Sequence, residues 1–327
     1  MGGDRFPDEI VKGVADASLA GTSRFALVGD TELLKKSLEG LKHDPSAIEI
    51  VGAECAVTME DDPMSILGSK RNSSMSVGLK MLKTDGDAFV SAGNTGALFT
   101  GASTIIRNVP GVKRAAIATL IPFERPILLL DSGANVNVLP EYFIDWAHLG
   151  SLYSEFVLGA GNPAVGLLNN GAESHKGGAM LAGTYALLEK EEGINFVGNV
   201  ESYDLPGAPC DVLLTDGFTG NVTLKLIEGL SVYFFRTMKH LMTETVFTKV
   251  FSAPLSGKIK SMKRVFDPTE YGGAPILGLR KPVIKAHGHS DARAITAAIR
   301  QAEAFVMADV TGMVIKWAAK GETASES

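Results

Sequence analysis

Short, continuous apolar runs alternate with stretches of helical periodicity along almost the whole sequence, and this alternation limits the folds open to the chain. We predict strands at Phe25–Val28, Ile48–Val51, Ala88–Ser91, Ala115–Leu120, Ile127–Leu130, Val165–Leu168, Asn195–Val197, Val212–Thr215 and Val283–Lys285. Because most of these runs are apolar throughout, both faces of each strand are expected to be buried, as in a parallel sheet covered by helices. The sequence therefore predicts an α/β fold with a doubly wound, mostly parallel sheet.

Helical patterns fill the intervals between the apolar runs. They cover Thr31–Glu39, Met75–Lys83, Gly96–Arg107, Glu141–Leu158, Gly178–Glu191 and Ser290–Ala319. The 327 residues contain no long low-complexity linker, so we expect a single α/β domain over residues 1–327. An apolar strand is expected before the first glycine turn of such a domain. Here that turn is Met1-Gly2-Gly3-Asp4, so we expect either that the first strand is missing or that the fold begins on a loop.

Residues 231–267 interrupt the alternation and predict a protruding helical arm. One helix is expected from the turn at Gly217 to about Thr245, followed by helical spacing that breaks at Pro254. The apolar positions of the arm include Phe247, Val250, Phe251 and Leu255. Its basic positions include Lys258, Lys260, Lys263 and Arg264. An ordinary helix pair with a solvated basic face fits this pattern as well as a surface for an acidic partner or anionic lipid does.

Composition excludes several classes of protein. The net charge of −6 argues against a nucleic-acid-binding protein, which usually carries a basic excess. Cys55 and Cys210 form no C-x-x-C motif and are expected to be reduced, buried thiols. No apolar run approaches the ~20 residues that span a bilayer. We therefore expect a cytoplasmic protein that reaches a membrane only through a surface element.

Four predicted strands are followed by turns rich in glycine, asparagine and hydroxyl side chains. These turns are Ser91–Ala97, Asp131–Val136, Asn169–Gly177 and Thr215–Thr223. Ligands of open α/β sheets bind beyond the carboxyl ends of the strands, where glycines permit close approach and helix N-termini offer free N–H groups. The four turns together predict a site for a small phosphate-like anion.

Ten residues on these turns and on one later loop are candidates for contact with the substrate. They are Asn94, Thr95, Asp131, Asn135, Glu173, Asp216, Gly217, Thr219, Gly220 and His287. Each has a structural alternative as well. Asn94 or Thr95 could simply cap a helix, Asp131 ends a buried strand and must be paired or functional, and His287 could be a structural histidine.

Several well-known site motifs are absent from the sequence. Neither G-x-G-x-x-G after a strand nor G-x-x-x-x-G-K-[ST] occurs, so no nucleotide-phosphate loop is predicted. The motifs G-x-S-x-G and H-E-x-x-H are also missing, and the pair His287 and His289 is a weak metal signal. We therefore expect no cofactor and no metal.

Taken together, the turns resemble those of the PlsX family of phosphate acyltransferases. The matching segments are Met1–Asp4, Ser91–Ala97, Asp131–Asn135, Asn169–Gly177, Asp216–Val222, Tyr271–Gly278 and Ala286–Gly288. They follow the family's order and cover nearly the whole chain. The sequence departs from the family's pattern in the strand before Met1, and at His289, where the family more often has serine.

The resemblance implies a fold like that of phosphotransacetylase and isocitrate dehydrogenase, and a reaction. A fatty acyl group would pass from acyl-acyl carrier protein to inorganic phosphate, giving acyl phosphate for a membrane glycerol-3-phosphate acyltransferase in phosphatidic acid synthesis. The resemblance also implies a homodimer and peripheral membrane contact through the arm. It points to Lys176 and Asn221 as catalytic positions. Because the carrier protein is acidic, we expect it to dock on the basic residues of the arm, whose apolar residues would touch lipid.

Three alternatives remain open at this stage. A phosphotransacetylase-like enzyme that uses acyl-coenzyme A would need the same fold and the same phosphate chemistry. An inactive scaffold of the same fold on a membrane surface is a second alternative, against which the presence of Lys176 and Asn221 argues. A dehydrogenase of the related fold is the third, and it lacks its dinucleotide fingerprint here.

Overall fold

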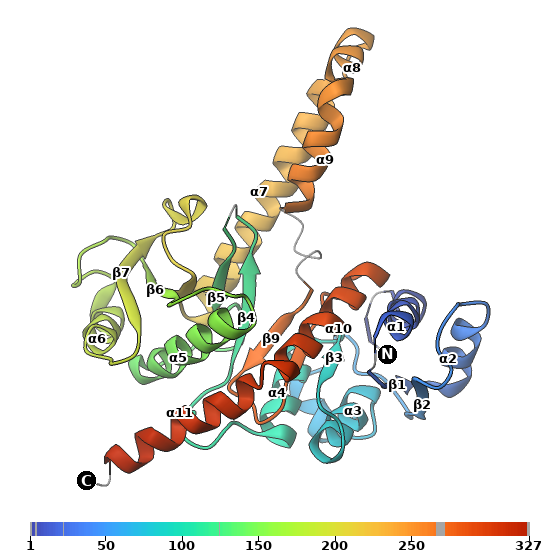
Figure 1. The fold of residues 1–327 in the computed structure, drawn as a ribbon, viewed down its shortest axis with the longest axis horizontal. Coiled ribbons are helices and arrows are strands. Elements are labelled where there is room, and N and C mark those ends of the chain that lie inside the picture. The colour runs from blue at the N-terminus through green and yellow to red at the C-terminus, as the bar shows by residue number, and fades with distance from the viewer. Residues whose placement is uncertain (1, 4, 22, 124, 266–271, 326–327) are drawn as a thin grey trace.

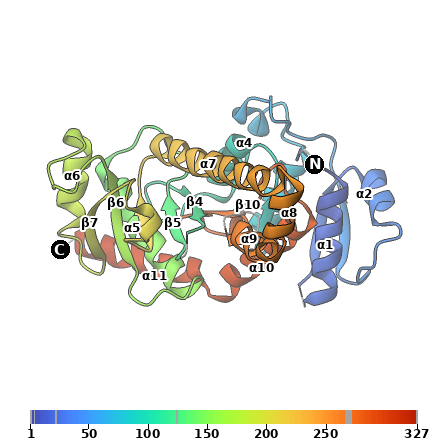
Figure 2. The same ribbon diagram turned by 90° about the horizontal axis from the view of Figure 1, so that it is seen from above.

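The computed structural model describes residues 2–3, 5–21, 23–123, 125–265 and 272–325, with the side chains of residues 250, 251, 253, 264, 265 and 321–325 outside that description. Its strands form one eight-stranded and one two-stranded sheet. Helices cover both faces of the larger sheet (Figure 1). Figure 2 shows α4 and α7 on one side of the strands and α10 and α11 on the other.

The larger sheet has the strand order β3-β10-β9-β4-β5-β8-β6-β7. These strands are β3 (Phe89–Ser91), β4 (Ala116–Ile121), β5 (Ile127–Leu130), β6 (Ala164–Asn169), β7 (Asn195–Glu201), β8 (Val212–Leu214), β9 (Ala274–Leu277) and β10 (Val283–Lys285). The pairs β10–β3, β5–β8, β6–β8 and β6–β7 are parallel, which confirms the predicted mostly parallel sheet. The antiparallel pairs β4–β5, β4–β9 and β9–β10 lie in its middle. The separate pair β1 (Phe25–Gly29) and β2 (Ile48–Gly52) is parallel.

The helices occupy the intervals that the periodicity predicts, with two differences. They are α1 (Asp8–Ala20), α2 (Thr31–Leu38), α3 (Ser74–Thr84), α4 (Thr95–Gly101), α5 (Pro140–Phe156), α6 (Gly178–Leu188), α7 (Gly217–Thr243), α8 (Val246–Ser252), α9 (Ser256–Val265), α10 (Ala292–Met307) and α11 (Val310–Ser325). The helix α1 was not predicted. The single helix predicted for Ser290–Ala319 is wrong, because Asp309 adopts a left-handed conformation (φ 49°) that ends one helix before the next begins.

The core explains why the apolar runs become strands. Leu128, Leu129 and Leu130 of β5 are fully buried, so successive side chains pointing to opposite faces of the sheet both meet helices. On one face Trp146 and Tyr153 of α5 are fully buried in the largest cluster. The free thiol of Cys210 lies in another cluster, where burial raises its pKa to about 12.

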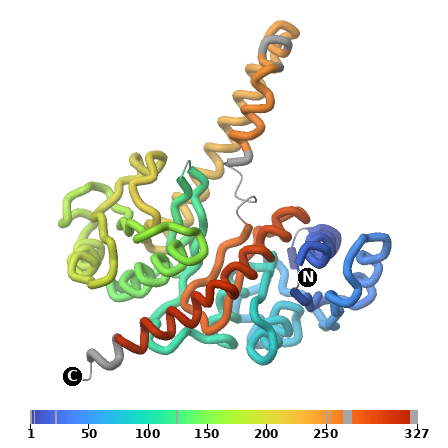
Figure 3. Tube along the Cα trace, in the orientation of Figure 1, coloured from blue at the N-terminus to red at the C-terminus, as the bar shows by residue number. Residues whose placement is uncertain are grey.

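The arm is a helical hairpin that projects from the body of the molecule. The 27-residue helix α7 leaves the sheet, α8 lies at the far end, and α9 returns beside α7 (Figures 1 and 3). The predicted break at Pro254 falls in a short 3₁₀ turn, Ala253–Leu255, between α8 and α9. Within the described part of the chain, no helix is long and apolar enough to cross a membrane.

Candidate functional site

A cleft of about 1640 Å³ opens at the base of α7 and continues along the arm between α7 and α9. Its inner end is lined by residues at or just after the carboxyl ends of β3, β5, β8 and β10, and the first three of these strands precede turns for which the sequence predicted an anion site. These residues are Thr95, Ser132, Gly133, Asn221, Lys285, His287 and Gly288. A volume of this size accommodates a ligand larger than an isolated phosphate ion.

Asn221 is the fifth residue of α7 and faces the inner end of the cleft. The helix begins there because the Asp216 carboxylate accepts hydrogen bonds from the N–H groups of Phe218 and Thr219, both at 2.9 Å. Gly133 lies opposite in the β5–α5 turn, and a Cβ there would be 3.5 Å from Cβ of Asn221. Among the described residues the side-chain amide of Asn221 has no hydrogen-bond partner, so both its N–H groups and its oxygen can meet a ligand.

Asp131 and Asn135 hold the β5–α5 turn together and do not line the cleft. The buried Asp131 carboxylate accepts backbone N–H hydrogen bonds from Ile117 (3.1 Å), Gly133 (3.2 Å) and Asn135 (2.6 Å). The Asn135 amide donates to Asp131 and to the carbonyl of Ala115, both at 2.9 Å. Burial raises the pKa of Asp131, and the donated hydrogen bonds oppose that rise. Their predicted contact with substrate is untested, and this geometry gives both residues a structural task.

The side chain of Asn94 is also engaged with backbone groups. Its Oδ1 accepts a hydrogen bond from the N–H of Ala97 (3.0 Å), and its Nδ2 donates to the carbonyl of Thr58 (3.1 Å). The neighbouring Thr95 is exposed and lines the cleft. Of these two candidates, Thr95 is therefore the one placed to contact a ligand.

The glycines at the start of α7 serve close packing. A Cβ on Gly220 would lie 2.0 Å from the carbonyl oxygen of Asp131, and one on Gly217 would lie 2.7 Å from the nitrogen of Asn135. The N–H of Gly217 donates to the carbonyl of Asn135 at 2.7 Å. Asp216 also accepts a hydrogen bond from the Thr219 hydroxyl at 2.6 Å. These contacts fix α7, and with it Asn221, against the β5–α5 turn.

Lys176 and Glu173 lie in the loop between β6 and α6. Nζ of Lys176 is 4.0 Å from the Glu173 carboxylate, and both side chains are partly exposed. Neither residue lines the cleft that contains Asn221. Because β6 and β8 are neighbours in the sheet, this loop starts one strand away from the strand that leads into α7. The joint catalytic role of Lys176 and Asn221 thus stays a prediction.

Lys285 is a cleft residue that the sequence-based prediction missed. It ends β10, is 9% exposed, and donates a hydrogen bond to the carbonyl of Ala286. Burial, followed by the positive charges of Lys225 and Lys285, lowers the pKa of the nearby His287 below its ordinary value of 6.5. A lysine at the end of an apolar strand, directly before a motif already assigned to the site, was the available signal.

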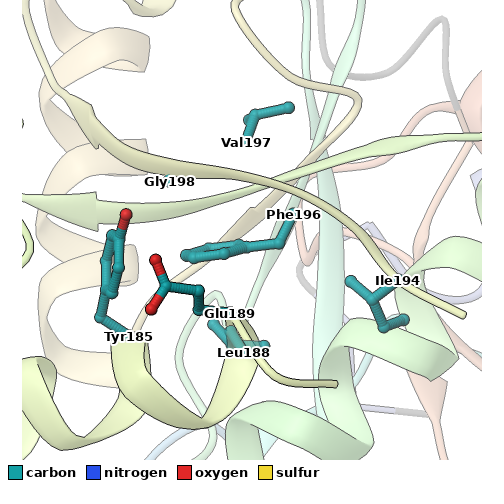
Figure 4. Close-up of a pocket in the computed structure, with 7 residues that line it drawn as sticks. All are labelled: Tyr185, Leu188, Glu189, Ile194, Phe196, Val197 and Gly198. Carbon is teal, nitrogen blue, oxygen red and sulfur yellow. The ribbon is translucent and has the colours of Figure 1, made fainter. Parts of the chain in front are cut away.

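A second, smaller pocket lies between α6 and β7 (Figure 4). It measures about 300 Å³, and its described lining includes Tyr185, Glu189 and Phe196 but no cationic side chain. The rings of Tyr185 and Phe196 pack edge to face at 5.1 Å. This lining is unsuited to an anion. In the described ranges no group of three or more His, Cys, Asp or Glu side chains could hold a metal ion.

Residues 1–313 match the model of a family described as fatty acid synthesis protein. The chain belongs to this family. It is 40% identical over 318 residues to the phosphate acyltransferase of Bacillus subtilis, covering 96% of this chain and 95% of that one. It is 42% identical over 308 residues to the phosphate acyltransferase of Acetivibrio thermocellus, covering 93% and 91%. These matches confirm the resemblance to the PlsX family, and the chain is an enzyme of the acyltransferase class.

Solved structures agree on the fold. A phosphotransacetylase from Streptococcus pyogenes superimposes with a TM-score of 0.63 at 15% identity, over 92% of both chains. The EutD phosphotransacetylase from Staphylococcus aureus gives a TM-score of 0.56 at 15% identity, over 91% of both chains. At this identity the likeness confirms the phosphotransacetylase-like fold.

Proposed function

We propose that this enzyme transfers a fatty acyl group from acyl-acyl carrier protein to inorganic phosphate, and that the acyl phosphate serves phosphatidic acid synthesis. The observation that carries the proposal is the inner end of the cleft, where the available amide of Asn221 lies among hydroxyl and cationic side chains. The names of the relatives from Bacillus subtilis and Acetivibrio thermocellus support phosphate as the acceptor.

The reaction requires the enzyme to position phosphate and thioester more than to activate the nucleophile. An oxygen of phosphate, already charged near neutral pH, would attack the thioester carbon to form a C–O bond. The C–S bond breaks, and the thiolate leaves with the electron pair. Asn221 would donate a hydrogen bond to the carbonyl oxygen as it becomes negative, and Thr95 with the positive charge of Lys285 would hold the phosphate. Lys176 would add a further positive charge if its loop closes towards this point.

His287 would contribute to phosphate binding in this scheme. Because its pKa is lowered in the free protein, the ring is mostly neutral near pH 7 and cannot then donate a proton. Binding of the phosphate dianion would raise that pKa again, since an opposite charge favours the protonated ring. We therefore assign His287 to phosphate binding, in which its protonated ring would meet the negative charge of the phosphate.

The arm would bring the enzyme to its macromolecular partners. Lys260 and Lys263 line the cleft, which fits docking of an acidic carrier protein, whereas Lys258 does not, and the side chain of Arg264 lies outside the described residues. At the far end, Phe247 is 71% exposed and Leu255 is 51% exposed, which fits peripheral contact with a membrane. Val250 and Phe251, expected to make the same contact, also have undescribed side chains.

An apolar stripe along α7 supports the expected homodimer. The stripe repeats about every four residues and is more than half exposed, and it consists of Phe218, Val222, Leu226, Leu230, Tyr233, Phe234 and Leu241. Such a row on a long helix is the pattern of a helix face that packs against another protein surface. A second copy of the chain would cover it with the same stripe about a twofold axis.

Product analysis with matched donors tests the proposed function. The protein is incubated with phosphate and palmitoyl-acyl carrier protein, or with palmitoyl-coenzyme A, and acyl phosphate is trapped with hydroxylamine. We expect acyl phosphate from both donors, with the carrier protein giving the higher kcat/KM. A preference for coenzyme A would make the chain a phosphotransacetylase-like enzyme. If neither donor gives acyl phosphate, the result would favour an inactive scaffold of the same fold.

A further inference from the structure

The outer half of the cleft is lined with positive charge that the reacting phosphate does not explain. Arg236 and Lys239 of α7, Lys249 of α8, and Lys260 and Lys263 of α9 all line it. Among the described lining residues the one carboxylate is that of Glu228, and it is paired with Lys225 at 2.7 Å. This concentration of cations stands out in a chain whose net charge is −6. A cleft with one sign of charge attracts ligands of the opposite sign.

The two helices present these cations to one shared space. The lining positions of α7 recur every three or four residues, and so do those of α9, so each helix turns one face to the cleft. The hydroxyl of Ser252 donates to the carbonyl of Met242 at 3.1 Å, which joins the hairpin near its far end. From there α9 runs back towards the body beside α7 (Figure 1), and its Lys260 and Lys263 line the same cleft as Arg236.

Distance separates this outer cluster from the site of reaction. Arg236 follows Asn221 by 15 residues, so their Cα atoms are about 22 Å apart along the helix. A long helical side chain leans over the turn before its own Cα, which brings the guanidinium to about 17 Å from Asn221. One phosphate ion cannot occupy both places. The outer cluster therefore fits a second anion, carried by the thioester donor.

We propose that Arg236, with Lys260 from the facing helix, binds the phosphate at the far end of the donor's phosphopantetheine arm. This inference rests on the proposed function, because it assumes that a thioester enters the cleft. About thirteen covalent bonds separate the phosphorus of that arm from its sulfur, and an extended chain of that length reaches about 15 Å. Because this reach is close to the separation of the Arg236 guanidinium from Asn221, the sulfur would lie beside Asn221 when the phosphate lies beside Arg236. Leu224, Glu228 and Ser231 of α7 line the cleft between the two ends.

Minimal donors test the subsite without the carrier protein. The donors are S-octanoyl-pantetheine and S-octanoyl-4′-phosphopantetheine, compared by kcat/KM for acyl phosphate at fixed phosphate concentration and ionic strength. A charge-assisted hydrogen bond in a partly solvated site predicts about a tenfold preference of the wild-type protein for the phosphorylated donor. Arg236→Ala and Lys260→Ala should reduce that ratio to within about twofold of one. The ratio cancels any general loss of activity.

Two control variants sharpen the result. Lys83→Ala removes an exposed lysine from α3 that does not line the cleft, and it should keep the wild-type ratio. Arg236→Lys should retain most of the preference, because a point charge still meets the phosphate. Octanoyl-acyl carrier protein and octanoyl-coenzyme A share the phosphopantetheine group, so Arg236→Ala should lower kcat/KM for both. A loss confined to the carrier protein would indicate contact with the protein surface and overturn the assignment.

The remaining outcomes separate this inference from the proposed function. A wild-type ratio near one, with acyl phosphate still formed, would overturn the subsite and leave the acyl transfer standing. If Arg236→Ala then weakens flotation on vesicles of anionic phospholipid, the outer cluster serves a lipid headgroup instead. No acyl phosphate from any donor would overturn both.

Discussion

The packing of α7 against the β5–α5 turn leaves no room for a side chain at position 220. A Cβ added to Gly220 would lie 2.0 Å from the carbonyl oxygen of Asp131, which is backbone and cannot rotate away. We expect Gly220→Ala to lower the free energy of unfolding by about 1–3 kcal/mol. Gly183→Ala is the matched control, since the nearest atom to its added Cβ is 3.8 Å away. Equal stability of the two variants in urea unfolding would contradict this packing.

The pKa of His287 is expected to depend on the charges in the cleft. Burial and the charges of Lys225 and Lys285 lower its pKa, whereas Glu228 acts in the opposite direction. A titration of the ring by NMR, assigned with His287→Gln, should give a pKa below 6.5 in the free protein. Adding phosphate should raise that pKa, and by linkage phosphate affinity should fall as the pH rises through it. A pKa that phosphate leaves unchanged would place the anion elsewhere.

At the scale of residues, several turns that the sequence singled out border the cleft, but the sequence did not separate structural from ligand-facing side chains. Asparagine, aspartate and glycine on the turns signalled both helix capping and ligand binding, and only coordinates separate the two. Asn94, Asn135 and Asp131 proved to be engaged with backbone groups, whereas Asn221 faces open space. Lys285 was not predicted because a lysine at the end of a strand is common, and only its neighbours in the structure show that it lines the cleft.

At the scale of elements, most strands followed from apolar runs, and the exceptions have physical reasons. The strand β9 is four residues long and contains Pro275, so it carries too little signal to separate from the glycine turn before it. The helix α1 does show helical periodicity, with buried Val11, Val14, Ala15 and Ser18, and could have been found. The break between α10 and α11 rests on one residue in the left-handed conformation, which aspartate tolerates and periodicity does not reveal.

The end of the arm gives a prediction that separates lipid contact from carrier docking. Val246 and Phe247 of α8 are 81% and 71% exposed, so Val246→Asp/Phe247→Asp should weaken flotation on anionic vesicles several-fold, because charged groups resist entry into the interface. Phe156→Asp on α5, away from the arm, is the control. Kinetics with acyl carrier protein in the absence of lipid should not change. Undiminished flotation of this variant would show that α8 does not contact lipid.

At the scale of the whole molecule, the α7 stripe predicts the oligomeric state. Leu226→Asp/Leu230→Asp places two charges in the stripe and should convert a dimer into a monomer, as seen by light scattering after size exclusion. Leu187→Asp, on α6 and 40% exposed, should leave the mass unchanged. A wild-type protein that is monomeric at micromolar concentrations would show that the stripe serves another purpose.

Acyl phosphate formation beside Asn221 is the step on which the proposed function most directly depends. Wild-type protein, Asn221→Ala and Lys176→Ala are compared with palmitoyl-acyl carrier protein and ³²P-phosphate, with circular dichroism and unfolding midpoints to confirm the fold. Loss of one hydrogen-bond donor to the reacting oxygen should slow product formation by about 10²–10³-fold in Asn221→Ala. Lys176→Ala should lose a similar factor if its loop joins the site. Near wild-type turnover by a folded Asn221→Ala protein would contradict the placement of the reaction in this cleft.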